Sequence, residues 1–131
     1  MPLWLVVIAI GIVTLRAQVS FDRVLHADKE PHNWLSYSGT LDNQRYSQLT
    51  QITAANVKNL QLQWIWQSKS IEKFEATPLV VDGVMYTVEA PNNVVALDAA
   101  TGRPYWQFNY TPSPDGRPCC GRVNRGLAIL G

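Results

Sequence analysis

The chain has 131 residues, 47% of them hydrophobic, and a formal net charge of +1 at pH 7. This length allows one small domain at most. The near-neutral charge and the lack of a basic run exclude a phosphate backbone as partner, so no nucleic-acid binding is expected. The two histidines, His26 and His32, show no metal-ligand spacing with each other or with the two cysteines, so no metal ligand is predicted in the chain.

Residues 1–17 are predicted to be a signal peptide. An almost unbroken apolar run from Leu3 to Leu15 has the length of a signal-peptide core and is shorter than the roughly 20 residues that cross a bilayer. Ala17 supplies a small residue for cleavage. No Lys or Arg precedes the run, so an uncleaved membrane anchor stays open as the alternative.

Residues 18–59 are predicted to be a lead-in segment that contains one short helix. Residues 18–33 are polar and without a period, as in a linker, and residues 34–49 carry scattered aromatic side chains, as in an irregular surface segment. The helix is expected at residues 53–59, with Thr53 as its N-cap and Asn59 at its end.

From residue 60 the pattern predicts strands. Residues 60–67 alternate and indicate a strand. A pair of strands, 78–81 and 84–88, then flanks the hairpin signal Asp82-Gly83. Two more short strands are expected, followed by a loop rich in Pro and Gly and the opening of another strand; these segments are residues 94–97, 105–108, 109–124 and 126–130.

Four short antiparallel strands joined by tight turns make one sheet, and one sheet cannot bury both of its faces alone. Radial stacking of such sheets gives a β-propeller, in which a blade takes roughly 40–50 residues. The fold class is therefore predicted to be all-β, with residues 60–131 forming about one full blade and the start of the next. We expect the chain to be a fragment of a longer protein. A small independent sandwich is the alternative.

Cys119 and Cys120 are adjacent, and they are the only cysteines in the chain. Neighbours make a poor disulfide, because ordinary bridges join Cα atoms roughly 4.4–6.8 Å apart and a trans peptide holds neighbours about 3.8 Å apart. Two interpretations stay open: reduced cysteines packed as small hydrophobes, and an oxidised pair that offers a rigid sulfur surface. Export would favour oxidation.

Residues 96–106, Ala-Leu-Asp-Ala-Ala-Thr-Gly-Arg-Pro-Tyr-Trp, resemble the quinoprotein propeller repeat Ala-x-Asp-x-x-Thr-Gly-x-x-x-Trp. The residue types suit a turn, because Asp98 and Thr101 can accept bonds from turn amides and Gly102 permits a positive φ. Trp106 offers a flat face for packing against the next blade.

Other segments narrow this resemblance to one family. Residues 34–47, 56–60 and 74–86 are similar to the start of mature PQQ-dependent alcohol dehydrogenases, where PQQ is pyrroloquinoline quinone. The run Cys-Cys-x-x-Val-Asn-Arg-Gly at residues 119–126 matches the vicinal-cysteine motif of that family. The resemblance covers about residues 34–131 and implies the N-terminal part of an eight-bladed propeller.

The resemblance also implies roles for four residues. Cys119 and Cys120 match the disulfide-bonded pair that forms a platform under one face of PQQ, and Arg125 matches the arginine that hydrogen-bonds the quinone oxygens. Glu75 matches a glutamate that contacts PQQ. Without the motif, Arg125 would be interpreted as a blade-edge salt bridge and Glu75 as an exposed strand-edge residue. Glu89 is expected to be solvated.

The implied function is that of a periplasmic dehydrogenase. Such an enzyme oxidises a primary alcohol or a sugar to the aldehyde and passes electrons through PQQ to a c-type cytochrome. The calcium or lanthanide ligands and the catalytic aspartate base of the family lie in later blades, so no catalytic residue is expected here and the fragment alone is expected to be inactive. The alternative is a non-catalytic propeller scaffold of the outer-membrane assembly type, which shares the Trp repeat.

Overall fold

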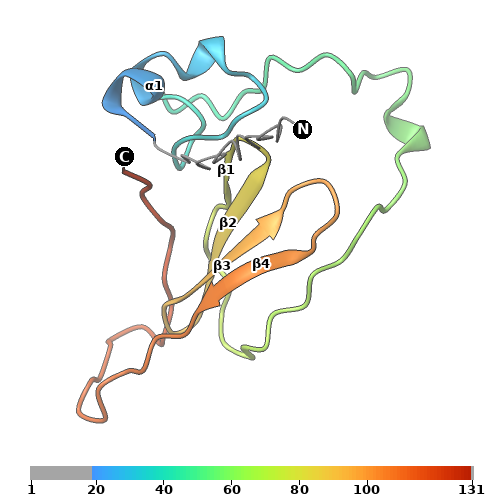
Figure 1. Ribbon diagram of the computed structural model, residues 1–131. Helices are drawn as coiled ribbons and strands as arrows, with labels where there is room; N and C mark the ends of the chain where they lie inside the picture. The colour runs from blue at the N-terminus through green and yellow to red at the C-terminus, as the bar shows by residue number, and fades with distance from the viewer. Residues whose placement is uncertain (1–18, 131) are drawn as a thin grey trace, which may run out of the picture.

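The computed structural model describes residues 19–130, so the predicted signal peptide at residues 1–17 lies outside the described residues. No helix within residues 19–130 is long and apolar enough to cross a bilayer. Helices come first and strands follow (Figure 1). In chain order the elements are α1 (Phe21–Leu25), the 3-10 helices η1 (Ala27–Lys29) and η2 (Val57–Asn59), and the strands β1 (Leu79–Val81), β2 (Val84–Glu89), β3 (Asn93–Asp98) and β4 (Pro104–Phe108).

The four strands form one antiparallel sheet in the order β1-β2-β3-β4. Each strand agrees with its predicted range to within one residue at either end. The hairpin between β1 and β2 turns on Asp82 and Gly83, whose φ angles are +50° and +82°. Two positive φ angles define the turn that matches the right-handed twist of paired strands. The prediction of a tight two-residue hairpin is confirmed.

The turn between β3 and β4 also forms as its residue types predict. Asp98 Oδ1 accepts hydrogen bonds from the backbone N–H groups of Ala100 at 3.0 Å and Thr101 at 2.9 Å. Gly102 has a φ of +71°. The hydroxyl of Tyr105 donates to Asp98 Oδ2 at 2.8 Å, and this bond, with the turn amides, holds the pKa of Asp98 below its usual value. The turn is therefore fixed by an ionised carboxylate.

Residues 60–67 do not form a strand, so that prediction was wrong. The side chains do alternate, because Trp64 and Trp66 are half-buried while Ile65 between them is 75% exposed. The segment nevertheless runs without a paired neighbour (Figure 1), and a strand needs a ladder partner. Residues 126–130 are likewise extended but unpaired, which corrects the strand expected there.

The lead-in segment is more ordered than predicted. The expected linker at residues 18–33, described here from residue 19, is not a plain linker. It contains α1, which Ser20 caps by accepting a hydrogen bond from the N–H of Arg23 at 3.3 Å. Val19, Ala27 and Leu35 pack with Val81 of β1 in a small core. The lead-in is therefore built onto the sheet.

The predicted helix at residues 53–59 is reduced to the single turn η2. It ends at Asn59 as expected, but Thr53 does not cap it through its side chain. Instead, the N–H of Thr53 donates to Asn56 Oδ1 at 2.7 Å, and Asn56 occupies the N-cap position. Seven residues are too few to propagate a helix without tertiary support, and all of this segment is exposed.

Arg23 of the lead-in bonds one carboxylate within the lead-in, Glu30, and one in the β1–β2 hairpin, Asp82. Arg23 Nη2 donates to Glu30 Oε2 at 2.6 Å and to Asp82 Oδ1 at 2.8 Å. The side chain of Asn33 donates to the same Glu30 oxygen at 2.7 Å. The hydrogen bond from Arg23 is the main reason that the pKa of Glu30 falls from 4.5 to about 2, and it also lowers the pKa of Asp82. Each of the two ion pairs of Arg23 therefore depends on its carboxylate being ionised.

Acid is expected to release this contact. Because the pKa of Glu30 is lower in the folded state, its contribution to stability is present above about pH 4.5 and disappears as the pH falls toward about 2. Hydrogen exchange, corrected for intrinsic rates, should show that residues 19–35 lose protection in this window in the full-length protein. Glu30→Gln should lower protection at neutral pH and flatten the acid dependence; an unchanged acid dependence would contradict the assignment.

Among the described residues, each face of the sheet is only partly covered. On one face, Trp64, Trp66 and Phe74 line a shallow apolar hollow over β2 and β3. On the other face, Trp106 is 50% exposed and its ring centroid lies 6.1 Å from that of Tyr86. A blade of a propeller needs a neighbour on each face. Packing of Trp106 against a next blade stays a prediction.

Candidate functional site

The structure brings together Glu75, which precedes the sheet in the sequence, and Arg125, which follows it. Glu75 lies in the extended run that leads into β1, and Arg125 lies in the long segment after β4. Arg125 Nε donates to Glu75 Oε2 at 3.2 Å. The arginine side chain is 74% exposed and the glutamate side chain 38%. Because both side chains are exposed, both groups are accessible to a ligand. An ion pair this exposed adds little stability.

Cys119 and Cys120 lie in the same neighbourhood. Their Sγ atoms are 2.8 Å apart, and both are free, exposed thiols. That distance exceeds a disulfide bond of about 2.05 Å, so the disulfide stays a prediction. Contact with Cys119 raises the pKa of Cys120, and the charge of Arg125 opposes this shift. The four predicted cofactor-binding residues therefore form one exposed cluster.

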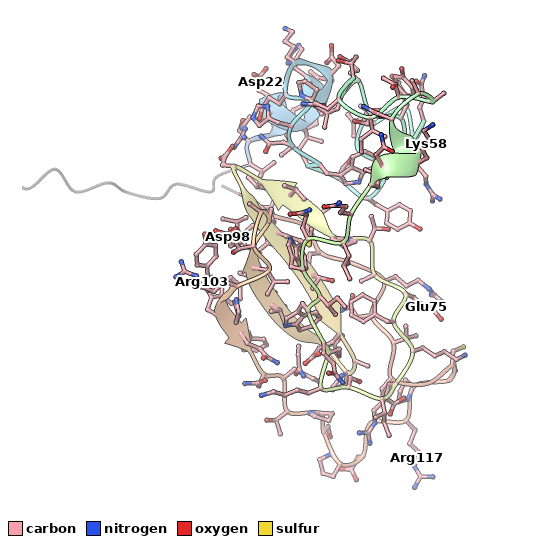
Figure 2. All side chains as sticks on the ribbon, turned by 90° about the vertical axis from the view of Figure 1, so that its right-hand side faces the viewer. Asp22, Lys58, Glu75, Asp98, Arg103 and Arg117 are labelled. Atoms are coloured by element: carbon pink, nitrogen blue, oxygen red, sulfur yellow. The ribbon has the colours of Figure 1, made fainter. Side chains whose placement is uncertain are left out.

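Asparagine side chains hold the loop that carries Arg125. Asn124 Nδ2 donates to Asn92 Oδ1 at 2.8 Å, and Asn92 lies in the short turn between β2 and β3. Asn124 Oδ1 in turn accepts a hydrogen bond from the N–H of Gly126 at 2.9 Å. Arg125 is thus flanked by Asn124, which is bonded to the β2–β3 turn, and by Gly126, which is bonded to Asn124. In Figure 2, Glu75 lies on the side of the molecule away from Asp98 and Arg103.

The expectation that Glu89 is solvated was wrong. Its side chain is buried, with only 2% of the residue exposed. Local sequence could not indicate this, because the donors that satisfy the buried carboxylate lie up to 21 residues away. The only hint was its position at the end of an otherwise apolar strand, Val84–Glu89.

One group of possible metal ligands forms elsewhere among the described residues. Carboxylate oxygens of Glu30 and Asp82 lie within 4.8 Å of each other and of an imidazole nitrogen of His32. Sequence spacing could not predict this group, because β1 and β2 bring Asp82 to it. Arg23 already forms an ion pair with each of the two carboxylates. The group is therefore an ion-pair network, and it provides no argument for a metal.

Comparison with known proteins identifies the class of fold. Residues 34–130 match the PQQ glucose/ethanol/alcohol dehydrogenase β-propeller domain. The solved structure of quinohemoprotein alcohol dehydrogenase ADHIIG from Pseudomonas putida superposes with a TM-score of 0.79 at 47% identity, covering 87% of this chain and 17% of that chain. The fold is therefore part of an all-β propeller of the quinoprotein class, as predicted.

Further relatives narrow the class to one family. Quinohemoprotein alcohol dehydrogenase ADH-IIG of Pseudomonas putida is 47% identical over 117 residues, which are 86% of this chain and 16% of that protein. The lanthanide-dependent methanol dehydrogenase of Methylacidiphilum fumariolicum is 41% identical over 115 residues, 82% of this chain and 18% of that protein. The chain belongs to the PQQ-dependent alcohol dehydrogenase family. It spans only about a sixth of the length of these relatives.

Proposed function

We propose that this chain is the N-terminal part of a periplasmic PQQ-dependent dehydrogenase that oxidises a primary alcohol to the aldehyde. The observation that carries the proposal is the exposed cluster of Glu75, Cys119, Cys120 and Arg125, which gathers from two segments within the family match. A periplasmic location rests on the apolar run at residues 3–15, which has the length of a secretory signal.

The cluster fits a planar, anionic quinone. Arg125 keeps its positive charge at any physiological pH and presents a planar fork of N–H donors. Within the described residues its guanidinium bonds only through Nε, to Glu75, which leaves the Nη atoms for ligand oxygens. The two exposed sulfur atoms provide a flat, polarisable surface beside it. Glu75 is held beside the cation, so its charge is compensated before a carboxylate-bearing ligand arrives.

Each of the four residues then has a role in the proposed cofactor site. PQQ, when bound, supplies a quinone that accepts the hydride of the alcohol. Arg125 donates hydrogen bonds to the oxygens on which negative charge develops, where a preorganised donor is most effective. Cys119 and Cys120 would support one face of the ring. Glu75 orients Arg125 and contacts the edge of the cofactor.

The metal and the electron acceptor belong to the longer protein. A calcium or lanthanide ion would act as a Lewis acid on the quinone. Support for a lanthanide comes from one solved relative, described as a europium-containing methanol dehydrogenase, whose TM-score with this chain is 0.72 at 38% identity. Several relatives are named quinohemoproteins or dehydrogenase subunits, which supports a c-type cytochrome, fused or separate, as acceptor.

A reconstitution experiment tests the function. The full-length protein, exported and purified without cofactor, is loaded with PQQ and either Ca²⁺ or La³⁺, and ethanol oxidation is followed with an artificial dye acceptor. Activity should require PQQ and one of the two metals, and residues 1–131 alone should be inactive. If the loaded full-length protein binds PQQ but oxidises neither primary alcohols nor sugars, or does not bind PQQ at all, the proposal is wrong.

Oxidation of the cysteine pair is expected in the exported protein. Alkylation under denaturing conditions without reductant, followed by intact mass measurement, should count no free thiol at Cys119 and Cys120 and two after reduction. The exposed sulfurs are already adjacent, and the compartment favours oxidation. Two free thiols in active enzyme would contradict the disulfide platform and leave Arg125 as the principal cofactor contact.

A further inference from the structure

Glu89 is a buried carboxylate at the end of β2 that accepts four hydrogen bonds from three different parts of the chain. Oε2 accepts bonds from the hydroxyl of Ser68 and from the N–H of Lys69, the latter at 3.3 Å. Oε1 accepts bonds from Asn93 Nδ2 at 3.2 Å and Gln107 Nε2 at 3.0 Å. All four groups act as donors, so the carboxylate acts only as an acceptor, as the ionised form requires.

This arrangement is unusual for a glutamate in a small sheet. Only 2% of the residue is exposed, and none of the ion pairs among the described residues involves it. A buried charge is tolerated only where hydrogen bonds replace its water, and charge-assisted bonds are stronger than neutral ones. The four donors therefore hold their own segments firmly to one point.

The first of these segments carries Glu75. Ser68 and Lys69 lie in the chain that runs along the sheet before β1, and no strand pairing fixes this chain. Ser68 Oγ also accepts a bond from the N–H of Ser70 at 3.0 Å. Glu89 is thus the polar anchor of the segment 68–75.

The second segment carries Cys119, Cys120 and Arg125. Asn93 Nδ2 donates a hydrogen bond to Glu89. Asn93 Oδ1 accepts a hydrogen bond from the N–H of Tyr110 at 2.8 Å, where the long loop begins. The bond from Tyr110 fixes the orientation of the Asn93 amide, since exchange of its O and N would place two donors face to face. Its neighbour Asn92 holds Asn124, beside Arg125, at the far end of the loop.

These contacts close a ring. It runs from Glu89 through the segment 68–75 to Glu75, across the ion pair to Arg125, and back through Asn92 and Asn93 to Glu89. We propose that Glu89 is a positioning residue, whose buried carboxylate fixes Glu75 and Arg125 relative to each other by holding both of the segments that carry them. This inference rests on the proposed function, because the cluster it orders is the proposed PQQ site.

The test uses three variants of the full-length protein. Glu89→Gln replaces an acceptor oxygen by a donor and so opposes donors on one side of the network. Asn93→Ala cuts the connection to the loop and leaves the buried carboxylate in place. Gln107→Ala is the matched control, because it removes the same type of donor from the same Glu89 oxygen but touches neither segment.

Hydrogen exchange gives a readout that needs no cofactor. Glu89→Gln should speed exchange about tenfold in both residues 68–76 and residues 109–126. Asn93→Ala should do so in 109–126 alone, and Gln107→Ala in neither. Equal effects of all three variants, or an effect of Glu89→Gln confined to its own strand, would overturn the proposal.

PQQ affinity gives the second readout, measured by fluorescence titration with PQQ in calcium-containing buffer. Glu89→Gln and Asn93→Ala should raise the dissociation constant about tenfold over wild type, within the range for coupling through a side-chain network, and Gln107→Ala less than twofold. If wild type binds PQQ and the first two variants bind equally well, the positioning role is refuted. If wild type does not bind PQQ, the proposed function fails, and the exchange pattern alone decides whether Glu89 couples the two segments.

Discussion

Replacing Arg125 by leucine in the full-length enzyme should lower kcat about a hundredfold or more, the usual effect of removing one preorganised donor from developing negative charge. Leucine is of similar bulk, so the loop loses the guanidinium without gaining a clash. The exposed pair with Glu75 contributes little stability, so the melting temperature should change little. Steady-state rates with saturating alcohol and a dye acceptor measure the effect.

A neighbouring arginine provides the control. Arg122 lies in the same loop and is exposed, so Arg122→Leu makes the same change in net charge a few residues away. It should leave kcat within about twofold of wild type. Arg125→Lys should restore only part of the activity, because an ammonium group lacks the planar fork. Comparable losses in Arg122→Leu and Arg125→Leu would show that loop charge, and not a hydrogen bond from Arg125, controls the rate.

Gly102→Ala is expected to destabilise the blade by about 2–4 kcal/mol. The φ of +71° is a left-handed conformation that alone costs a residue with a Cβ about 1–2 kcal/mol. A Cβ at this position would also lie 2.4 Å from Cε3 and 2.6 Å from Cδ2 of Trp64. The indole is half-buried over the turn, so it must move and lose its packing. Urea unfolding of the full-length protein, followed by tryptophan fluorescence, measures the loss.

Gly83 separates the two causes of this loss. Its φ is +82°, but a Cβ there would meet nothing within 4 Å. Gly83→Ala should therefore lower the free energy of unfolding by the backbone cost alone, about 1–2 kcal/mol. If the two variants were equally unstable, the close approach of Trp64 to the turn would not contribute, and the packing of residues 60–67 on the sheet would be in doubt.

The strands could be predicted because short-range signals define them. Asp82-Gly83 fixes a hairpin through positive φ angles, and Asp98 with Gly102 fixes the next turn through bonds made within a few residues. Alternation at residues 60–67 was equally clear, but a strand also needs a partner, and sequence period does not supply one. Helix α1, only five residues long, was missed because a short helix depends on its cap and on packing rather than on a long apolar period.

The residues of the candidate site could be predicted from the family resemblance, but the hydrogen-bond network around Glu89 could not. The motif at residues 119–126 predicted Cys119, Cys120 and Arg125, and the structure places them near Glu75. Nothing in the motif indicated that Glu89 would be buried, since its four donors come from positions 68, 69, 93 and 107. Networks of this kind arise only when the sheet brings distant residues together.

The bridge between Trp34 and Val80 makes the lead-in part of the same folding unit as the sheet. Trp34 exchanges two backbone hydrogen bonds with Val80, of 2.8 and 3.1 Å, along the free edge of β1. An edge left bare can pair with another chain. The family match starts at residue 34, yet Val19 and Ala27 before it complete the core under Val81. The lead-in therefore covers both this edge and the core beside it, and a protein trimmed to residues 60–131 would expose the edge of β1 and be prone to self-association.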